Sequence, residues 1–364
     1  MPVKSSVFKW GLILLLLGVG GVLLTLWRRV DVQVKRLLLP NVLMYAGFED
    51  VPEKTQGVQF DTFEVQGWDG LPVRVCIVRK ADNSEELTPR QHTLLDRLSG
   101  IELDELSDID YALISVNWDH GIHSALPLAE GLAAAGIKCV LWEPRGSNSR
   151  RPWCTHGLQE SRDVPLIIDA LEKKAGRQGL MVVGIGSGFG AELMLQAAAK
   201  EPRLRATVAI NPAASLNKTL KSARVSTPMR ELIGWRMNQL TGLEPFDIAA
   251  VKSASLLPRE VPVMLVHTGE QGEGGTMDDA VAIFTQLKSD MRRLITPRNG
   301  SDAPDATTRT IIYSPEGGTH EVQQKVETEL TSEAEEIPVE ILRWLNACMR
   351  PLRESPLPSI TPKR

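Results

Sequence analysis

A glycine-rich run places a serine hydroxyl at the end of a predicted strand. Residues 184–190 read GIGSGFG and continue the apolar run at residues 180–185, which has the length of a buried strand. A serine at such a turn can attack an acyl group when a base takes its proton and N–H groups bind the oxyanion. Ser187 is the candidate nucleophile, and the alternative is that it begins the following helix as an N-cap.

The same run also fits a nucleotide-binding fingerprint. Residues 186–191, GSGFGA, match the pattern G-x-G-x-x-[GA] between a strand and a helix. That fingerprint requires an acidic residue at the end of the next strand to hold the ribose. The next apolar run, residues 206–210, is followed by Asn211 and Pro212 instead. Nucleotide binding is therefore the minor alternative.

Composition and charge exclude several classes of protein. The chain has 364 residues, 43% hydrophobic residues and a net charge of −4, which suits one large or two medium globular domains. The slight acidity gives no electrostatic reason to expect nucleic-acid binding. Four cysteines form no disulfide framework, and His120, His123 and His156 lack metal-ligand spacing. We predict neither a metal nor a cofactor.

An uncharged segment near the N-terminus predicts a membrane anchor. Residues 10–27 contain no charged side chain, and as a helix they would span about 27 Å, close to the thickness of a bilayer core. The run leads directly into Trp27, Arg28 and Arg29 without a small-residue cleavage site, which favours an anchor over a signal peptide. Basic residues on both sides leave the orientation open.

The remaining chain predicts an α/β domain. Two alternating runs around Trp68-Asp69-Gly70, within residues 60–79, indicate a β-hairpin. Beyond residue 110, strand-like runs alternate with helical patterns, which predicts about eight strands, mostly parallel, with helices on both faces. The strand-like runs are residues 111–116, 137–142, 180–185, 206–210, 261–266 and 310–313, and the helical patterns are residues 125–135, 160–175, 191–199, 278–287 and 338–349.

These patterns divide the chain into three parts. We predict an anchor and linker over residues 1–40, an α/β domain over 41–350 and a disordered proline-rich tail over 351–364. Within the domain, a polar surface insertion covers residues 81–108, and a small helical lid covers residues 212–259.

This order of elements resembles the α/β-hydrolase superfamily, in particular its dienelactone-hydrolase and esterase-like members. Residues 126–149, LPLAEGLAAAGIKCVLWEPRGSNS, look like a helix, a strand and the motif D-x-R-G that follows, with Glu143 in place of Asp. Residues 261–271, VPVMLVHTGEQ, look like the seventh strand of that fold. Residues 315–322, PEGGTHEV, look like the loop that delivers the catalytic histidine.

The resemblance implies a serine, a histidine and an acid that act together. Aligned by its glycines, the elbow motif G-x-S-x-G falls on Gly184, Gly186 and Gly188, so that a glycine occupies the nucleophile position. Ser187, one residue later, remains the candidate nucleophile of this degenerate elbow. His320 is the candidate general base.

The position of the acid also departs from the pattern. The residue after the seventh strand that is usually Asp is Gly272, and Glu270 and Glu273 are the candidate substitutes. Asp278 and Asp279 come later, where they fit the first turn of a helix.

Two functions follow from these residues. The first is a membrane-anchored serine hydrolase for a carboxylic ester or related acyl substrate, with oxyanion donors from the loop at Asn117 and Trp118 and from Gly188. The second is a catalytically inactive α/β-hydrolase-fold protein that serves as a binding or interaction module. The glycines at Gly186 and Gly272 favour this second function.

Overall fold

A computed structural model describes most of the chain. The described residues are 3–39, 54–55, 57–81, 87–99, 104–115, 122–145, 153–243, 249–268, 275–296, 309–313, 319–322 and 333–354.

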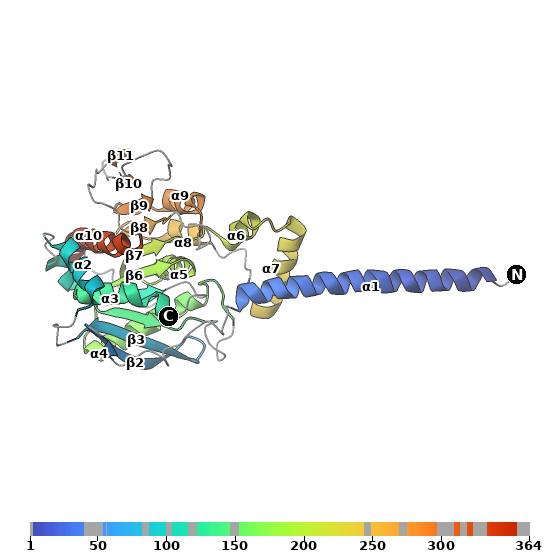
Figure 1. Cartoon of the computed structure of the whole chain (residues 1–364), viewed down its shortest axis with the longest axis horizontal. Helices are drawn as coiled ribbons and strands as arrows, with labels where there is room; N and C mark the ends of the chain where they lie inside the picture. Colours follow the sequence, from blue (N-terminus) through green and yellow to red (C-terminus); the bar gives the residue numbers. More distant parts are fainter. Residues whose placement is uncertain are drawn as a thin grey trace.

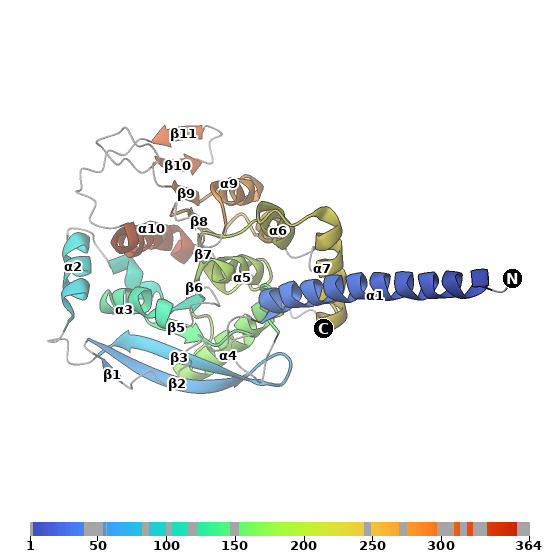
Figure 2. The same cartoon turned by 45° about the vertical axis from the view of Figure 1, so that its right-hand side comes forward.

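The predicted hairpin is confirmed. Strands β2 (Val58–Gln66) and β3 (Pro72–Lys80) pair antiparallel over nine residues each, and the short β1 (Lys54–Thr55) pairs with β2. Gly70 has a φ of 79°, the backbone conformation that an Asp-Gly turn requires. The hairpin forms one edge of the sheet (Figure 2).

A parallel sheet forms the centre of the domain. Its strands follow the predicted apolar runs because strands buried on both faces lack polar alternation. The sheet order is β1-β2-β3-β5-β4-β6-β7-β8-β9-β10-β11. The parallel members are β4 (Tyr111–Ser115), β5 (Cys139–Trp142), β6 (Val182–Ser187), β7 (Leu204–Ile210), β8 (Val263–Val266) and β9 (Arg292–Thr296).

The last parallel strand differs from the predicted one. It is β9, whereas the predicted residues 310–313 belong to β10 (Arg309–Tyr313), which pairs antiparallel with β9 and with β11 (Thr319–Val322). The described sheet therefore has eleven strands rather than about eight. Strand β9 does not form an apolar run because it begins with two arginines. The guanidinium of Arg292 lies 5.2 Å from the ring centre of Phe284, and Arg293 pairs with Glu340 at 2.9 Å.

Helices cover both faces of the sheet (Figure 1). Because side chains of a strand alternate, each strand contributes to two separate apolar clusters. One cluster includes side chains of α4 (Asp163–Ala175), α5 (Phe189–Ala198), α8 (Ala250–Leu256) and α9 (Met277–Gln286). The other includes side chains of α2 (Pro89–Leu98), α3 (Leu126–Ala134) and α10 (Glu333–Glu354). Short 3₁₀ turns are η2 (Asp104–Asp108), η3 (Ile122–Ser124) and η4 (Glu160–Arg162).

The N-terminal helix is longer than predicted. Helix α1 (Val3–Leu38) extends away from the domain, and only its C-terminal end packs against the predicted lid, at α6 (Leu216–Ser222) and α7 (Thr227–Thr241) (Figure 1). Among the residues whose side chains are described, which within α1 are residue 10 and residues 14–38, no helix has the length and apolar character needed to cross a bilayer. At the other end, α10 runs to Glu354, so the predicted start of the tail at residue 351 is too early; residues 355–364 lie outside the described residues.

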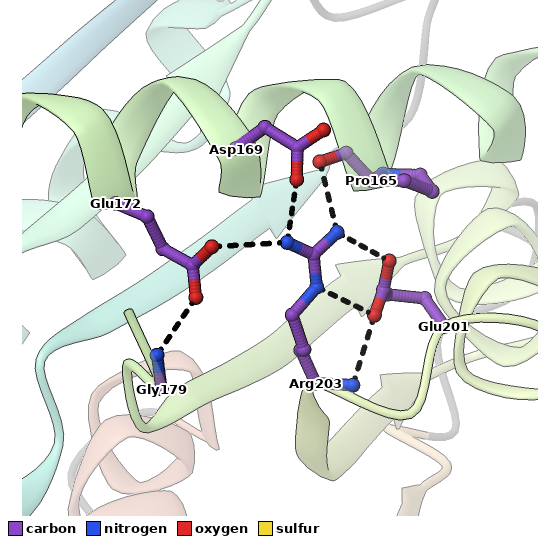
Figure 3. A network of polar contacts seen from close by, with 6 residues as sticks. All are labelled: Pro165, Asp169, Glu172, Gly179, Glu201 and Arg203. Carbon is purple, nitrogen blue, oxygen red and sulfur yellow. Dashed lines mark hydrogen bonds and ion pairs between the residues drawn. The ribbon is translucent and has the colours of Figure 1, made fainter. Parts of the chain in front are cut away.

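A partly buried arginine, Arg203, joins α4 to the amino end of β7 (Figure 3). Arg203 donates to Asp169 at 2.5 Å, to Glu172 at 3.2 Å and to both carboxylate oxygens of Glu201 at 2.8 and 2.9 Å. It also donates to the carbonyl oxygen of Pro165 at 3.2 Å. These bonds join α4 to the start of β7, and the hydrogen bonds that Arg203 donates to Glu201 help to hold the pKa of Arg203 above its ordinary value.

Removal of this guanidinium should destabilise the domain. We expect Arg203→Met to lower the free energy of unfolding by about 3 kcal/mol, because Glu201 and Glu172 would remain largely buried without their cation. Chemical denaturation of the full chain in detergent measures this change. The control is Arg259→Met, whose ion pair with Asp290 is exposed and should contribute less than about 1 kcal/mol. Equal effects of the two substitutions would contradict the assignment.

Candidate functional site

The strand-to-helix turn after β6 is made by a single residue, Gly188. Strand β6 ends at Ser187 and α5 begins at Phe189. Gly188 has a φ of 54° and a ψ of −119°, a conformation that residues with a side chain rarely adopt. Its N–H donates to the carbonyl oxygen of Ile210 in β7 at 2.8 Å, which holds the turn against the neighbouring strand.

Two further glycines allow the turn to close. A Cβ on Gly186 would lie 2.2 Å from the carbonyl oxygen of Gly190 and 2.5 Å from the amide nitrogen of Ala191, so backbone from both sides of the turn meets here. Small residues two before and two after the turn residue are what a nucleophile elbow requires. The elbow frame is therefore Gly186, Gly188 and Gly190, and the turn residue, where such an elbow carries its nucleophile, has no side chain.

The expected frame of Gly184, Gly186 and Gly188 is thus wrong by two residues. Glycines at every second position from 184 to 190 fit either frame, and only the backbone angle at Gly188 distinguishes them. Gly184 instead lies within β6, where a Cβ would meet the flexible side chain of Met194 at 3.0 Å.

Ser187 is the last residue of β6 rather than the turn residue. It is half-buried and lies in register with Ile210 of β7. It is not the N-cap of α5 either, because that position belongs to Gly188. Ser187 is therefore neither at the turn of the elbow nor at the N-cap of the helix, the two positions predicted from the sequence.

His320 lies far from the elbow. It belongs to β11, opposite Ile312 of β10, so the expectation of a loop is wrong. Five strand spacings of about 4.8 Å, or about 24 Å, separate β11 from β6 in the sheet. The cause is β9, which takes the last parallel position and leaves β10 and β11 to pair at the edge of the sheet. The structure therefore does not bring Ser187 and His320 together.

The other predicted site residues lie outside the described residues. They are Asn117 and Trp118 of the oxyanion loop and the candidate acids Glu270 and Glu273. Their roles stay predictions.

Asn211 joins two strand ends beside the elbow, a role that was not predicted from the sequence. Asn211 follows β7 with a φ of 49°, donates to the Thr268 hydroxyl at 2.8 Å and accepts from the Thr268 N–H at 2.9 Å. Its carbonyl oxygen accepts the N–H of Gly275 at 2.8 Å. Asn tolerates the left-handed region and pairs with backbone groups, so an Asn at a strand end was the available signal.

The pKa values of titratable groups on neighbouring segments are shifted from their ordinary values. Burial raises the pKa of Glu192, on the first turn of α5, to about 8. Burial lowers the pKa of His267, although Asp279 opposes this. Burial would raise the pKa of Asp279, but hydrogen bonds from Thr276 and the ion pair with Lys218 at 2.9 Å lower it. Asp279 also completes a capping box on α9, which fits its expected place in a first helical turn. No group of three metal-ligating side chains converges within the described part of the chain.

Arg145, from the segment that resembles the D-x-R-G motif, supports the hairpin. Arg145 pairs with Asp69, and the guanidinium groups of Arg145 and Arg162 lie 5.0 and 4.8 Å from the ring centre of Trp68. The backbone N–H of Trp68 donates to Asp163 at 3.2 Å. Together, these contacts pack the tip of the hairpin against the domain.

A buried histidine links α1 to the elbow. His156 is within 3.1 Å of the carbonyl oxygen of Leu37 through Nε2, and its ring meets the edge of Phe189, with centroids 6.0 Å apart. Phe189 directly follows the turn residue. The N–H of Cys154 donates to the carbonyl oxygen of Leu38 at 2.8 Å. The segment that contains Cys154 and His156 is therefore bonded to the C-terminal end of α1 at two points. Burial lowers the pKa of His156 to about 4, so the neutral ring donates to Leu37 at pH 7.

Comparisons with known proteins identify no family for this chain. No protein-family model matches the sequence, and no curated protein is similar to it in sequence. Structures that are similar include an esterase from Pyrococcus furiosus, at 14% identity and a TM-score of 0.48 over 81% of this chain and 92% of that one. An acylaminoacyl peptidase from Pyrococcus horikoshii has 12% identity and a TM-score of 0.46 over 68% of this chain and 38% of that one.

A third similar structure is a puromycin-hydrolysing peptidase from Mycobacterium tuberculosis, at 12% identity and a TM-score of 0.46 over 68% of this chain and 36% of that one. This chain thus spans less than two fifths of the length of either peptidase. The strand order, the antiparallel hairpin and the two helical layers define the class: the protein has the α/β-hydrolase fold. No activity follows from these similarities.

The elbow geometry predicts unequal effects of two neighbouring substitutions. Gly186→Ala should lower the free energy of unfolding by about 3 kcal/mol, because the new methyl group would overlap the backbone of Gly190. Gly184→Ala should cost about 1 kcal/mol or less, because the Met194 side chain can move. Denaturation of both variants in detergent measures the difference, and equal costs would show that the glycine frame is misplaced.

The histidine predicts a pH-dependent stability. The pKa of His156 is about 4 in the folded chain and about 6.5 in the unfolded one, so its contribution is complete above pH 6.5 and is lost as pH falls towards 4. His156→Asn keeps a residue that tolerates the φ of 52° and removes the titration. From pH 7 to pH 5, the free energy of unfolding of the unsubstituted chain should fall by about 2 kcal/mol relative to the variant. A constant difference would refute the burial of a neutral imidazole.

Proposed function

We propose that this chain is a non-catalytic protein of the α/β-hydrolase fold, anchored to a membrane through residues 10–27 and acting as a binding or interaction module. The single observation that carries the proposal is the absence of a side chain at Gly188, the turn residue of the elbow. An elbow with glycine at the turn keeps the backbone geometry of the fold but has no hydroxyl or thiol that could attack an acyl group.

The distance to the candidate base supports the same conclusion. A general base acts within hydrogen-bond reach, about 2.6–3.2 Å, of the proton that it takes. Ser187 lies before the turn, and His320 lies in a strand about 24 Å across the sheet. Side chains of Ser and His cannot bridge that separation.

A second candidate is a serine hydrolase that uses Ser187 on a carboxylic ester or related acyl compound. The observation that favours it is the position of Ser187, half-buried between two glycines whose backbone is permissive. A displacement of the turn by one residue would present its hydroxyl.

A fluorophosphonate probe separates the two candidates. We expect no covalent labelling of the purified full chain, because the described elbow lacks a side chain at its turn. An active serine hydrolase in the same tube verifies the reagent, and intact-mass spectrometry measures labelling. Labelling that disappears in Ser187→Ala but persists in Ser226→Ala, an exposed serine of the lid, would establish the hydrolase and overturn our proposal.

The sequence and exposure of α1 support the anchor. Residues 10–27 carry no charge, and Leu14, Leu15, Leu16 and Leu17 are each more than 60% exposed, so a large apolar surface faces the surroundings. Trp10 and Trp27 stand at the two ends of the segment, as tryptophans do at membrane interfaces.

Charges in the middle of this segment should release the protein. We expect the unsubstituted chain to stay with membranes at alkaline pH, and a Leu15→Arg, Leu16→Arg variant to be extracted, since each arginine costs about 3 kcal/mol at the bilayer centre. The matched control, Leu15→Ile with Leu16→Ile, should stay with the membranes. Extraction of the unsubstituted chain would contradict the anchor.

A further inference from the structure

An aromatic pair marks the point where α1 meets the lid. The rings of Trp27 on α1 and Trp235 on α7 lie edge to face with centroids 5.8 Å apart. Both remain exposed, at 41% and 51%, and the guanidinium of Arg236 lies 4.9 Å from the ring centre of Trp27. Trp27 is also the last residue of the uncharged segment, so the pair sits at the end of the proposed anchor.

Helix α7 is firmly fixed to α1. Val30 and Val34 of α1 are buried in one cluster with Ile233 and Met237 of α7. Beside this cluster, Arg236 donates to Asp31 from two nitrogens at 2.9 and 3.1 Å. Figures 1 and 2 both show α7 lying across α1, next to the point where α1 leaves the domain. If residues 10–27 span a bilayer, α7 would therefore lie at a fixed distance from the bilayer surface.

The outer surface of α7 suits the boundary of a membrane. Leu232, at 37% exposure, lies one turn from Trp235 and faces the surroundings with it. Tryptophan prefers the headgroup level, where its apolar ring and polar N–H are both satisfied.

The charge around this surface is basic. Residues 215–242 contain five basic residues and one acidic residue, Glu231, and residues 28–38 contain four basic residues and one acidic residue, Asp31. Lys221, Arg28 and Arg29 are exposed. Basic residues close to a membrane attract anionic lipid headgroups.

We propose that α7 lies on the membrane surface and forms a second contact with the bilayer, with Trp27 and Trp235 at the headgroup level and the basic lid bound to anionic lipids. This inference rests on the anchor proposed above. Helix α6 directly follows β7, and the end of α1 bonds to the loop that meets Phe189 at the elbow. The contact would therefore turn the carboxyl edge of the parallel sheet towards the membrane.

A fluorescent probe on α7 tests the contact. The four cysteines of the chain are buried, so a thiol-reactive bimane will select the new thiol of Leu232→Cys. The full chain is reconstituted into phosphatidylcholine vesicles with 30% phosphatidylserine and a lipid that carries a nitroxide near the headgroup. We expect quenching at least twofold stronger than for the control Lys173→Cys, an exposed site at the C-terminal end of α4.

Flotation of the vesicles separates the two proposals. If the chain floats with the vesicles and the probe at position 232 is quenched no more than the control, the α7 contact is wrong and the anchor stands. If the chain does not float, the anchor fails and the α7 contact fails with it.

A charge change tests the lipid class. Lys221→Glu, in the Leu232→Cys background, should reduce quenching about twofold in vesicles with phosphatidylserine and change it little in pure phosphatidylcholine. Lys173→Glu in the same background should leave quenching unchanged in both. Equal quenching in the two vesicle types before the charge change would refute the assignment to anionic headgroups.

Discussion

The contact between Gly186 and the backbone at Gly190 is the constraint on which the candidate site depends. It lets β6 pass directly into α5 through one residue, and that residue must adopt a positive φ. In a hydrolase, this turn holds a serine in a strained conformation so that its hydroxyl is exposed. Here Gly188 makes the same turn without strain and without a hydroxyl. The backbone geometry of the elbow is thus present, with a glycine as its turn residue.

The end of α1 is built into this architecture. Its last carbonyl oxygens are bonded by the loop that contains Cys154 and His156, and the His156 ring contacts Phe189 beside the turn. The lid helices pack against the same end of α1 through Val30, Val34 and the Asp31–Arg236 pair. A displacement of α1 would therefore act on both the lid helices and the loop beside the elbow.

Most of the fold could be predicted from the sequence, because strands buried on both faces leave uninterrupted apolar runs and the hairpin carries an Asp-Gly turn. Three strands were not predicted: β1, β9 and β11. Of these, β9 is the parallel one, and its arginines contact Phe284 and Glu340, which a short sequence window around β9 does not contain. Because β9 was not predicted, His320 was expected in a loop after the last parallel strand, whereas it lies in the edge strand β11. At the elbow, alternating glycines left the frame ambiguous by two residues, since only a backbone angle separates the two alignments. Asn211 and His156 act through contacts across the fold, which spacing alone does not reveal.

The distance between Ser187 Oγ and the nearest imidazole nitrogen, measured in a crystal structure of the protein, decides whether the elbow can act as a serine nucleophile site. We expect that Gly188 makes the turn and that no imidazole nitrogen lies within hydrogen-bond reach of that oxygen. An imidazole nitrogen at about 3 Å, with the chain turning at Ser187, would contradict it.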